Sequence, residues 1–145
     1  MVKVFVDTNV LVDFLVSSRA GHKSSLALFN LILSHKIEGV ISVQSIIDAA
    51  YICRRSPSYD DAVFRSAIDM LISRMNVDSI STFDVRDAIG NQDLDIEDSS
   101  HISFAYDQVC DYIVTNDNHF LSRNLPVPIV AITTEEFVSR CKLPD

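Results

Sequence analysis

The sequence predicts an α/β fold: a three-layer α/β/α sandwich with a central parallel sheet of four to five strands. Short apolar segments alternate with longer amphipathic segments along the whole chain. This alternation is typical of β–α–β units joined by right-handed crossovers. A length of 145 residues suits one domain, and no repeat or low-complexity linker divides it. We therefore expect a single domain over residues 1–145.

The strands are expected where short segments are rich in β-branched and aromatic residues. The first strand ends directly at Asp7, and the fourth is followed by Asn116 and Asp117. A proline at the start of the fifth predicts an edge position. The expected strands are Val2–Val6, Val40–Val43, Val77–Ser81, Tyr112–Thr115 and Pro128–Ile132.

The helices are expected where apolar residues recur three or four apart, usually after a capping residue. On the helix over 60–75, we expect Val63, Ala67, Met70, Leu71 and Met75 to face the core. The expected helices run from Thr8 or Asn9 to Leu15, from Ser24 or Ser25 to a C-terminal end near Gly39, from Ser45 to Arg55, from Asp60 to Met75, from Thr82 or Asp84 to Gly90, over Ile102–Val109, over His119–Leu121, and onward from Thr133 or Thr134.

Composition restricts the class of protein. Apolar residues make up 48% of the chain, in the range of globular proteins. No apolar run approaches the ~18–20 residues that a membrane span needs, and an acid follows the first apolar residues too early for a signal peptide. The three cysteines, Cys53, Cys110 and Cys141, are too scattered for a disulfide framework or zinc site. We expect buried free thiols and a cytoplasmic protein.

The net charge of −8 gives the chain no broad electrostatic attraction for phosphate, whereas nucleic-acid-binding proteins are usually basic. Two interpretations remain. Either the chain does not bind nucleic acid, or many of its acids are concentrated at a site that a metal ion neutralises.

Four acids are expected at the carboxyl edge of the sheet, where ligands of parallel α/β sheets bind. Asp7 and Asp117 follow strands, Asp48 lies in the first turns of a helix that follows a strand, and Asp98 lies at the start of the helix before the fourth strand. Converging carboxylates repel one another unless a cation is present. Hard oxygen ligands suit Mg²⁺ or Mn²⁺, and such an ion supports hydrolysis of phosphodiesters.

Each candidate also has an ordinary structural explanation. Asp7 could simply cap a helix, and Asp117 could be a turn residue. Asp98 could be a first-turn acid that interacts favourably with the helix dipole, and Asp48 could be a solvated helix residue. Their joint occurrence favours the functional interpretation. His22 and His119 are expected to be ordinary surface histidines, and Arg54 and Arg55 to be favourable charges at a helix C-terminus.

At this point the sequence resembles PIN-domain ribonucleases of the VapC toxin type. The resemblance lies in Val4–Leu11 (VFVDTNVL), in Tyr112–Phe120 (YIVTNDNHF), and in Glu97-Asp98 followed seven residues later by Ala105. Together these motifs span nearly the whole chain.

The resemblance implies roles for particular residues. Asp7, Asp98 and Asp117 match the family's metal-binding acids, and Asp48 stands where the family usually has a glutamate. Thr8 or Asn9 matches the polar residue that holds the first acid, with Thr115 and Asn116 as polar support near the last. We therefore expect Asp7, Asp48, Asp98 and Asp117 to be catalytic, the first, third and fourth as metal ligands.

The resemblance also implies a PIN-like sandwich and Mg²⁺- or Mn²⁺-dependent cleavage of single-stranded RNA. VapC-type members often form homodimers and are inhibited by a small antitoxin protein that covers the acidic site. The sequence thus predicts an endoribonuclease, the toxin of a toxin–antitoxin pair.

The alternative is a catalytically weak or inactive PIN-like binding or regulatory module, favoured by the shorter side chain of Asp48 and by the net charge of −8. A receiver-type signalling domain fits less well, because it needs several acids after the first strand and Val4–Asp7 carries one.

Overall fold

The computed structural model describes residues 1–121, 125 and 127–141, apart from the side chain of His119. The expectation for that histidine therefore lies outside the described residues. The strands found are β1 (Lys3–Val6), β2 (Glu38–Ser42), β3 (Asn76–Asp78), β4 (Tyr112–Val114) and β5 (Val130–Ile132). The helices found are α1 (Thr8–Leu15), α2 (His22–Leu33), α3 (Val43–Cys53), α4 (Asp61–Arg74), α5 (Thr82–Ile89), α6 (Ile96–Asp107), α7 (Asn118–Leu121) and α8 (Thr134–Cys141).

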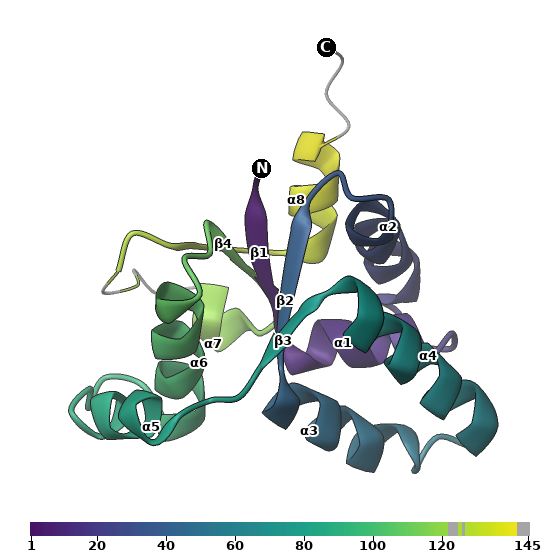
Figure 1. The fold of residues 1–145 in the computed structure, drawn as a ribbon, viewed down its shortest axis with the longest axis horizontal. Coiled ribbons are helices and arrows are strands. Elements are labelled where there is room, and N and C mark those ends of the chain that lie inside the picture. Colours follow the sequence, from purple (N-terminus) through teal and green to yellow (C-terminus); the bar gives the residue numbers. More distant parts are fainter. Residues whose placement is uncertain (122–124, 126, 142–145) are drawn as a thin grey trace.

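The five strands form one parallel sheet in the order β3-β2-β1-β4-β5. This confirms the predicted α/β class and the edge position of β5. The chain builds the sheet outward from β1 in one direction through β2 and β3, and in the other through β4 and β5 (Figure 1). The strand order therefore reverses between β1 and β4, the point where parallel sheets bind ligands.

Alternation along the strands sends side chains into two cores. Val4 and Val6 of β1 enter a core completed by α1, α2, α4 and α8, whereas Phe5 enters a core completed by α6 and α7. Figure 1 shows these helices on opposite faces of the sheet, with α5 packed outside α6. The predicted three-layer sandwich is confirmed. No helix among the residues described is long and apolar enough to cross a membrane.

Several helix starts differ from the expected ones, because residues just upstream provide the caps. Asp7, not Thr8 or Asn9, caps α1 by accepting a hydrogen bond from the backbone N–H of Thr8. Ser42 caps α3, which begins before Ser45. At α5, Ser81 forms a capping box with Asp84, and at α6, Asp95 caps a helix that begins at Ile96. Helix α2 begins at His22 rather than Ser24, without a side-chain cap.

The expected role of Gly39 as a helix end is wrong. Helix α2 ends earlier, and His35 adopts the left-handed conformation (φ 59°) beyond it. Gly39 lies inside β2, where an added Cβ would come within 2.8 Å of side-chain carbons of Ile32 and Met75. The glycine therefore allows α2 and α4 to lie close to the strand.

Some expected core positions are exposed. On α4, Leu71 and Met75 are buried, but Val63 is 66% exposed and Met70 39% exposed. The helix packs on the core through Ile68 and Leu71. Its apolar residues therefore occupy more than one face, and those away from the core are exposed. Cys53 and Cys110 are buried free thiols as expected, whereas Cys141 at the end of α8 is exposed.

Candidate active site

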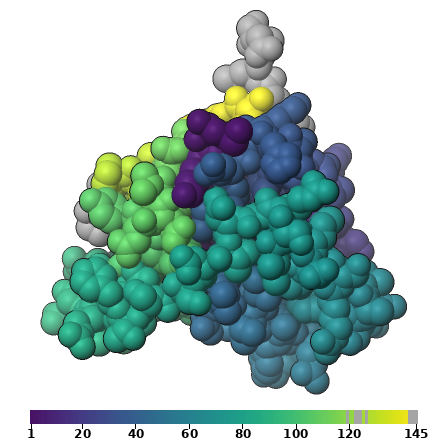
Figure 2. Space-filling view, in the orientation of Figure 1, coloured from purple at the N-terminus to yellow at the C-terminus, as the bar shows by residue number. Residues whose placement is uncertain are grey.

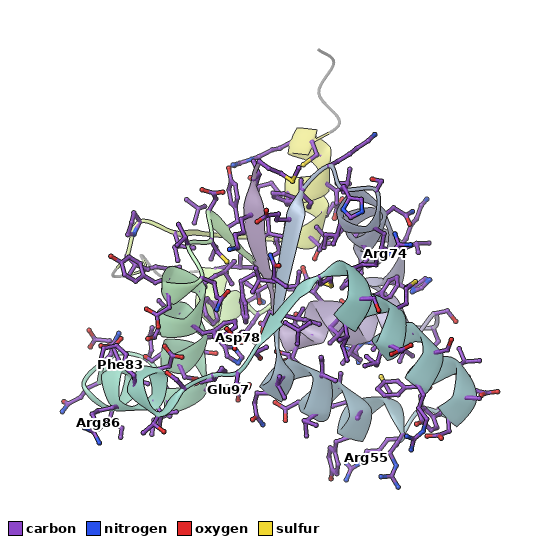
Figure 3. The ribbon with its side chains drawn as sticks, viewed as in Figure 1. Arg55, Arg74, Asp78, Phe83, Arg86 and Glu97 are labelled. Carbon is purple, nitrogen blue, oxygen red and sulfur yellow. The ribbon has the colours of Figure 1, made fainter. Side chains whose placement is uncertain are left out.

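A hollow of about 690 Å³ opens beside the carboxyl ends of β1 and β4. Its lining contains the four aspartates predicted from the sequence together with Glu97. They come from the end of β1, from α3, from α6 and from the segment after β4. Glu97 lies in the first turn of α6 (Figure 3). Helix α5 and the region of α3 form separate projections at the bottom of the molecule (Figure 2).

Another hollow, of about 730 Å³, lies between α3 and α4. Two carboxylates, Asp61 and Asp69, line it together with Arg54 and Arg65. Asp61 accepts hydrogen bonds from Tyr59 (2.7 Å) and Arg65 (2.6 Å). Those partners satisfy the charge of Asp61, so we assign the candidate site to the sheet edge.

Asp7 is the carboxylate that the protein holds most firmly. It is 8% exposed. Its Oδ1 accepts from the backbone N–H of Thr8 (2.8 Å) and its Oδ2 from the hydroxyl of Thr115 (2.7 Å). Burial acts to raise the pKa of Asp7, but His101, Thr115 and Thr8 more than offset it, so the pKa lies below its usual value. Asp7 is thus ionised and fixed in orientation.

Thr115 joins the two strand-end acids. Besides donating to Asp7, its Oγ1 accepts from the backbone N–H of Asp117 (3.0 Å). The residue is fully buried. One hydroxyl therefore connects the ends of β1 and β4, which agrees with the supporting role expected of Thr115.

His101 is a site residue that the sequence analysis missed. It is buried on α6, and its Nδ1 lies 3.5 Å from Oδ1 of Asp7. Within the part of the chain that the structure describes, Nδ1 has no hydrogen-bond partner, so the two side chains interact as an ion pair when His101 is protonated. Burial acts to lower the pKa of His101. The negative charges of Asp7, Glu97 and Asp98 more than offset this, so the pKa lies above its usual value. Its position three residues after Asp98 was the available signal, because such residues share a helix face.

Asp98 is held much less firmly than Asp7. Its backbone N–H donates to Asp95 (2.7 Å), but among the described residues no donor reaches its carboxylate. Burial, followed by the charges of Asp95, Asp117 and Asp7, raises the pKa of Asp98 to about 6. Asp98 therefore lies close enough to Asp7 and Asp117 to be repelled by both.

The remaining predicted residues take varied positions. Asp48 lines the hollow, and its Oδ1 accepts from Gln44 at 3.5 Å. The hydroxyl of Thr8 donates to Ser45 on α3 (2.9 Å), which ties α1 to the helix that carries Asp48. Asn9 contacts no carboxylate in the described part of the chain; its Oδ1 accepts from the backbone N–H of Asn116 (3.4 Å).

The donor set is compatible with a hard divalent cation. All five acids of the hollow offer carboxylate oxygens, and the repulsion that Asp98 meets from Asp7 and Asp117 would be relieved by positive charge. Over the described residues, no three acids, histidines or cysteines are close enough to form a ready-made ligand group. Mg²⁺ usually keeps several waters and is held by one or two carboxylates, so such a group is not required.

Comparison with known proteins identifies the family. The family model for the PIN domain matches residues 3–119 of this chain. The chain belongs to the PIN domain family. The matched region includes every carboxylate of the hollow.

Individual PIN-domain relatives are VapC toxins. Ribonuclease VapC1 of Aquifex aeolicus is 29% identical over 143 residues, which cover 95% of this chain and 94% of that protein. The crystal structure of VapC20 of Mycobacterium tuberculosis, described as a sarcin-ricin loop cleaving toxin, matches with a TM-score of 0.68 at 13% identity, covering 88% of this chain and 98% of that one.

A third match is the structure of VapBC2 from Rickettsia felis bound to a DNA fragment from its promoter, with a TM-score of 0.62 at 16% identity and coverage of 90% and 98%. These structural likenesses confirm the fold. Together with the family match, they make the chain a PIN-domain protein related to VapC toxin ribonucleases.

Proposed function

We propose that this chain is a metal-dependent endoribonuclease that hydrolyses phosphodiester bonds in single-stranded RNA. The observation that carries the proposal is the convergence of carboxylates from four separate segments of a PIN domain on one hollow, at the point where the strand order reverses. Asp7, Asp98 and Asp117 would hold Mg²⁺ or Mn²⁺, and Asp48 would complete the shell directly or through water.

A divalent ion bound there supplies a water of lowered pKa and neutralises charge on the phosphoryl group. The side chains of the protein supply the geometry. Thr115 fixes one oxygen of Asp7 while the backbone of Thr8 fixes the other, and His101 places positive charge behind it when protonated. Such outer contacts orient a ligand and tune its affinity.

The proposal includes the biological setting of a toxin. The relative with 29% identity is named a ribonuclease, and VapBC2 is one of the structures that match the fold. We therefore propose that a small antitoxin protein covers the acidic hollow and that the chain acts as a homodimer.

The test is cleavage of a labelled single-stranded RNA in the presence of Mn²⁺. Asp98→Asn removes a carboxylate of the hollow and is expected to lower the cleavage rate by more than about 100-fold, on the scale of losses at metal ligands and their supports. Asp69→Asn, on the exposed face of α4 outside the hollow, is the matched control and should cut at the wild-type rate. Equal rates for wild type and Asp98→Asn would contradict the assignment.

A second candidate is a PIN-domain binding module with weak or no catalysis. It is favoured by Asp48, one methylene shorter than the glutamate that VapC-type proteins usually carry, and by the absence of a ready-made ligand group among the described residues. A wild-type chain that binds a small antitoxin but neither Mn²⁺ nor RNA would support it.

A further inference from the structure

Arg19 has a distinctive position at the edge of the acidic hollow. Five carboxylates line this hollow, and Arg19 is the one lysine or arginine that lines it within the described residues. An RNA chain that reaches the acids carries a negative charge at every phosphate, and the whole protein has a net charge of −8. A phosphate beside the reacting one therefore meets repulsion everywhere in the hollow except at this guanidinium.

Arg19 is held in place by a buried carboxylate. Its Nε donates to Oδ1 of Asp13 at 2.7 Å, and the side chains of the two residues are 40% and 9% exposed. A guanidinium has five N–H donors in a fixed planar arrangement. The bond through Nε restrains the plane, and the donors of the two terminal amino groups form no hydrogen bond within the described residues.

Asp13 is itself fixed from several directions. The side-chain amide of Asn116 donates to its Oδ2 (3.3 Å), and Nδ1 of His22 lies 2.9 Å from its carbonyl oxygen. An added Cβ at Gly21 would lie 2.2 Å from Oδ2 of Asp13, so this glycine leaves the space that the carboxylate occupies. The segment after β4 thus supports the carboxylate of Asp13 directly, and the start of α2 supports the backbone of the same residue.

Arg19 also lies between two depressions of the surface. A neighbouring hollow of about 540 Å³ shares Arg19 with the acidic one and includes Asp13, Asn116 and Thr133 in its lining. A single strand that crosses from one hollow to the other must pass the guanidinium.

We propose that Arg19 is the phosphate-binding residue of this site: its terminal amino groups bind a phosphate of single-stranded RNA next to the scissile one, and Asp13 is the positioning residue that orients it. The proposal rests on the proposed function and names how the same site recognises its substrate. It also assigns Asn116 to the support of Arg19 through Asp13, and not to an acid of the hollow.

The experiment measures binding of a labelled single-stranded RNA over a range of KCl concentrations. The Asp98→Asn chain serves as the background, at constant Mn²⁺, so that RNA is not consumed. Adding Arg19→Gln should weaken binding about tenfold, as expected for loss of a charged hydrogen bond. It should also reduce the slope of log affinity against log salt by about 0.7, the value for one phosphate contact of a single strand.

Two further variants separate this role from a purely structural one. Arg74→Gln removes the same charge from the end of α4, directly before β3 and hence near the opposite edge of the sheet (Figure 3); it should change neither the slope nor the affinity by more than about twofold. Arg19→Lys keeps the charge but cannot bond Asp13 and phosphate in one plane. It should keep the wild-type slope and lose part of the affinity. A structural ion pair would change the melting temperature and not the slope.

In chains with Asp98 intact, Arg19→Gln should raise KM about tenfold and leave kcat within about twofold, because contact with a neighbouring phosphate is made equally in ground and transition states. Mn²⁺ binding should persist.

If Arg19→Gln keeps the slope and KM of the wild type while the wild type cuts RNA, the role of Arg19 is overturned and the proposed function stands. If the wild type binds no Mn²⁺ and cuts no RNA, the proposed function fails. If the Asp98→Asn chain binds no RNA, the comparison of KM in chains with Asp98 intact decides the role of Arg19.

Discussion

The two walls of the acidic hollow differ in how the protein compensates their carboxylates. On the sheet side, Asp7 is buried, accepts hydrogen bonds from Thr8 and Thr115, and has a pKa below its usual value. On the helical side, the carboxylate of Asp98 meets no donor from the described residues, and burial with neighbouring acids raises its pKa to about 6. The fold therefore stabilises the first charge by itself, whereas it destabilises the second, which a bound cation would stabilise.

The largest expected contrast is in stability without metal. Asp7→Ala removes a helix cap and leaves the buried hydroxyl of Thr115 without its acceptor. We expect it to lower the free energy of unfolding by about 3 kcal/mol. Asp98→Ala removes a charge that its neighbours repel, and the free energy of unfolding at neutral pH should rise by about 1 kcal/mol. Urea unfolding followed by circular dichroism measures both, and equal losses would remove the distinction between the walls.

Substitution of Thr115 tests only the sheet side of the hollow, where Asp7 lies. Thr115→Val keeps the shape but loses the donor to Asp7 and the acceptor for the Asp117 backbone. We expect a loss of about 1–2 kcal/mol in unfolding free energy and of about 10–100-fold in cleavage rate. Thr115→Ser keeps the hydroxyl and should restore most of both. A valine variant with wild-type cleavage would show that the orientation of Asp7 does not matter.

The pH dependence of metal-free stability tests the helical wall. Because the pKa of Asp98 is about 6 when folded and lower when unfolded, the native state binds more protons between about pH 4 and 6. Stability should therefore fall as pH rises through this range. With allowance for solvent screening, we expect a fall of about 1 kcal/mol. The lowered pKa of Asp7 acts oppositely: its contribution is present above about pH 4 and is lost at lower pH.

The control for this pH effect is Asp98→Asn, which should reduce the decline between about pH 4 and 6 and leave the loss at lower pH unchanged. Part of the decline should remain, because Asp84 raises the pKa of Asp107 to about 6 as well. Melting temperatures in metal-free buffers across this range provide the measurement. A decline of the same size in Asp98→Asn would mean that other groups cause it.

Asp48 provides the smallest expected effect. Asp48→Glu lengthens the side chain by one methylene toward the length usual in VapC-type proteins. If Asp48 acts through water, the longer carboxylate should raise Mn²⁺ affinity by about two- to tenfold, on the scale of changes in the surroundings of a metal. Asp48→Gln, of the same length without charge, is the matched control. Weaker binding by the glutamate variant would mean that the shorter side chain suits this hollow.

Much of the sheet edge could be predicted because strand ends are local features. The apolar runs that end at Asp7 and before Asp117 place both acids at one edge once the strands are parallel. Helix faces were harder: α4 carries apolar residues on more than one face, so the pattern placed Val63 and Met70 in the core, and both are exposed.

The polar contacts of the site depend on tertiary proximity, which spacing does not encode. Thr115 and Asp7 are 108 residues apart in sequence, and only the family resemblance suggested Thr115. His101 on α6 approaches Asp7 at the end of β1, although 94 residues separate them in sequence. Arg19 lies in a segment between two helices, where no periodicity marks a residue as part of the site.

The central claim is that Asp98, on the helical side of the hollow, helps to bind a divalent cation. Mn²⁺ titration calorimetry on metal-free protein tests this claim most directly. The account predicts saturable binding by the wild type, loss of that binding in Asp98→Asn, and wild-type binding in Asp69→Asn. No binding by the wild type up to millimolar Mn²⁺, or equal binding by wild type and Asp98→Asn, would contradict it.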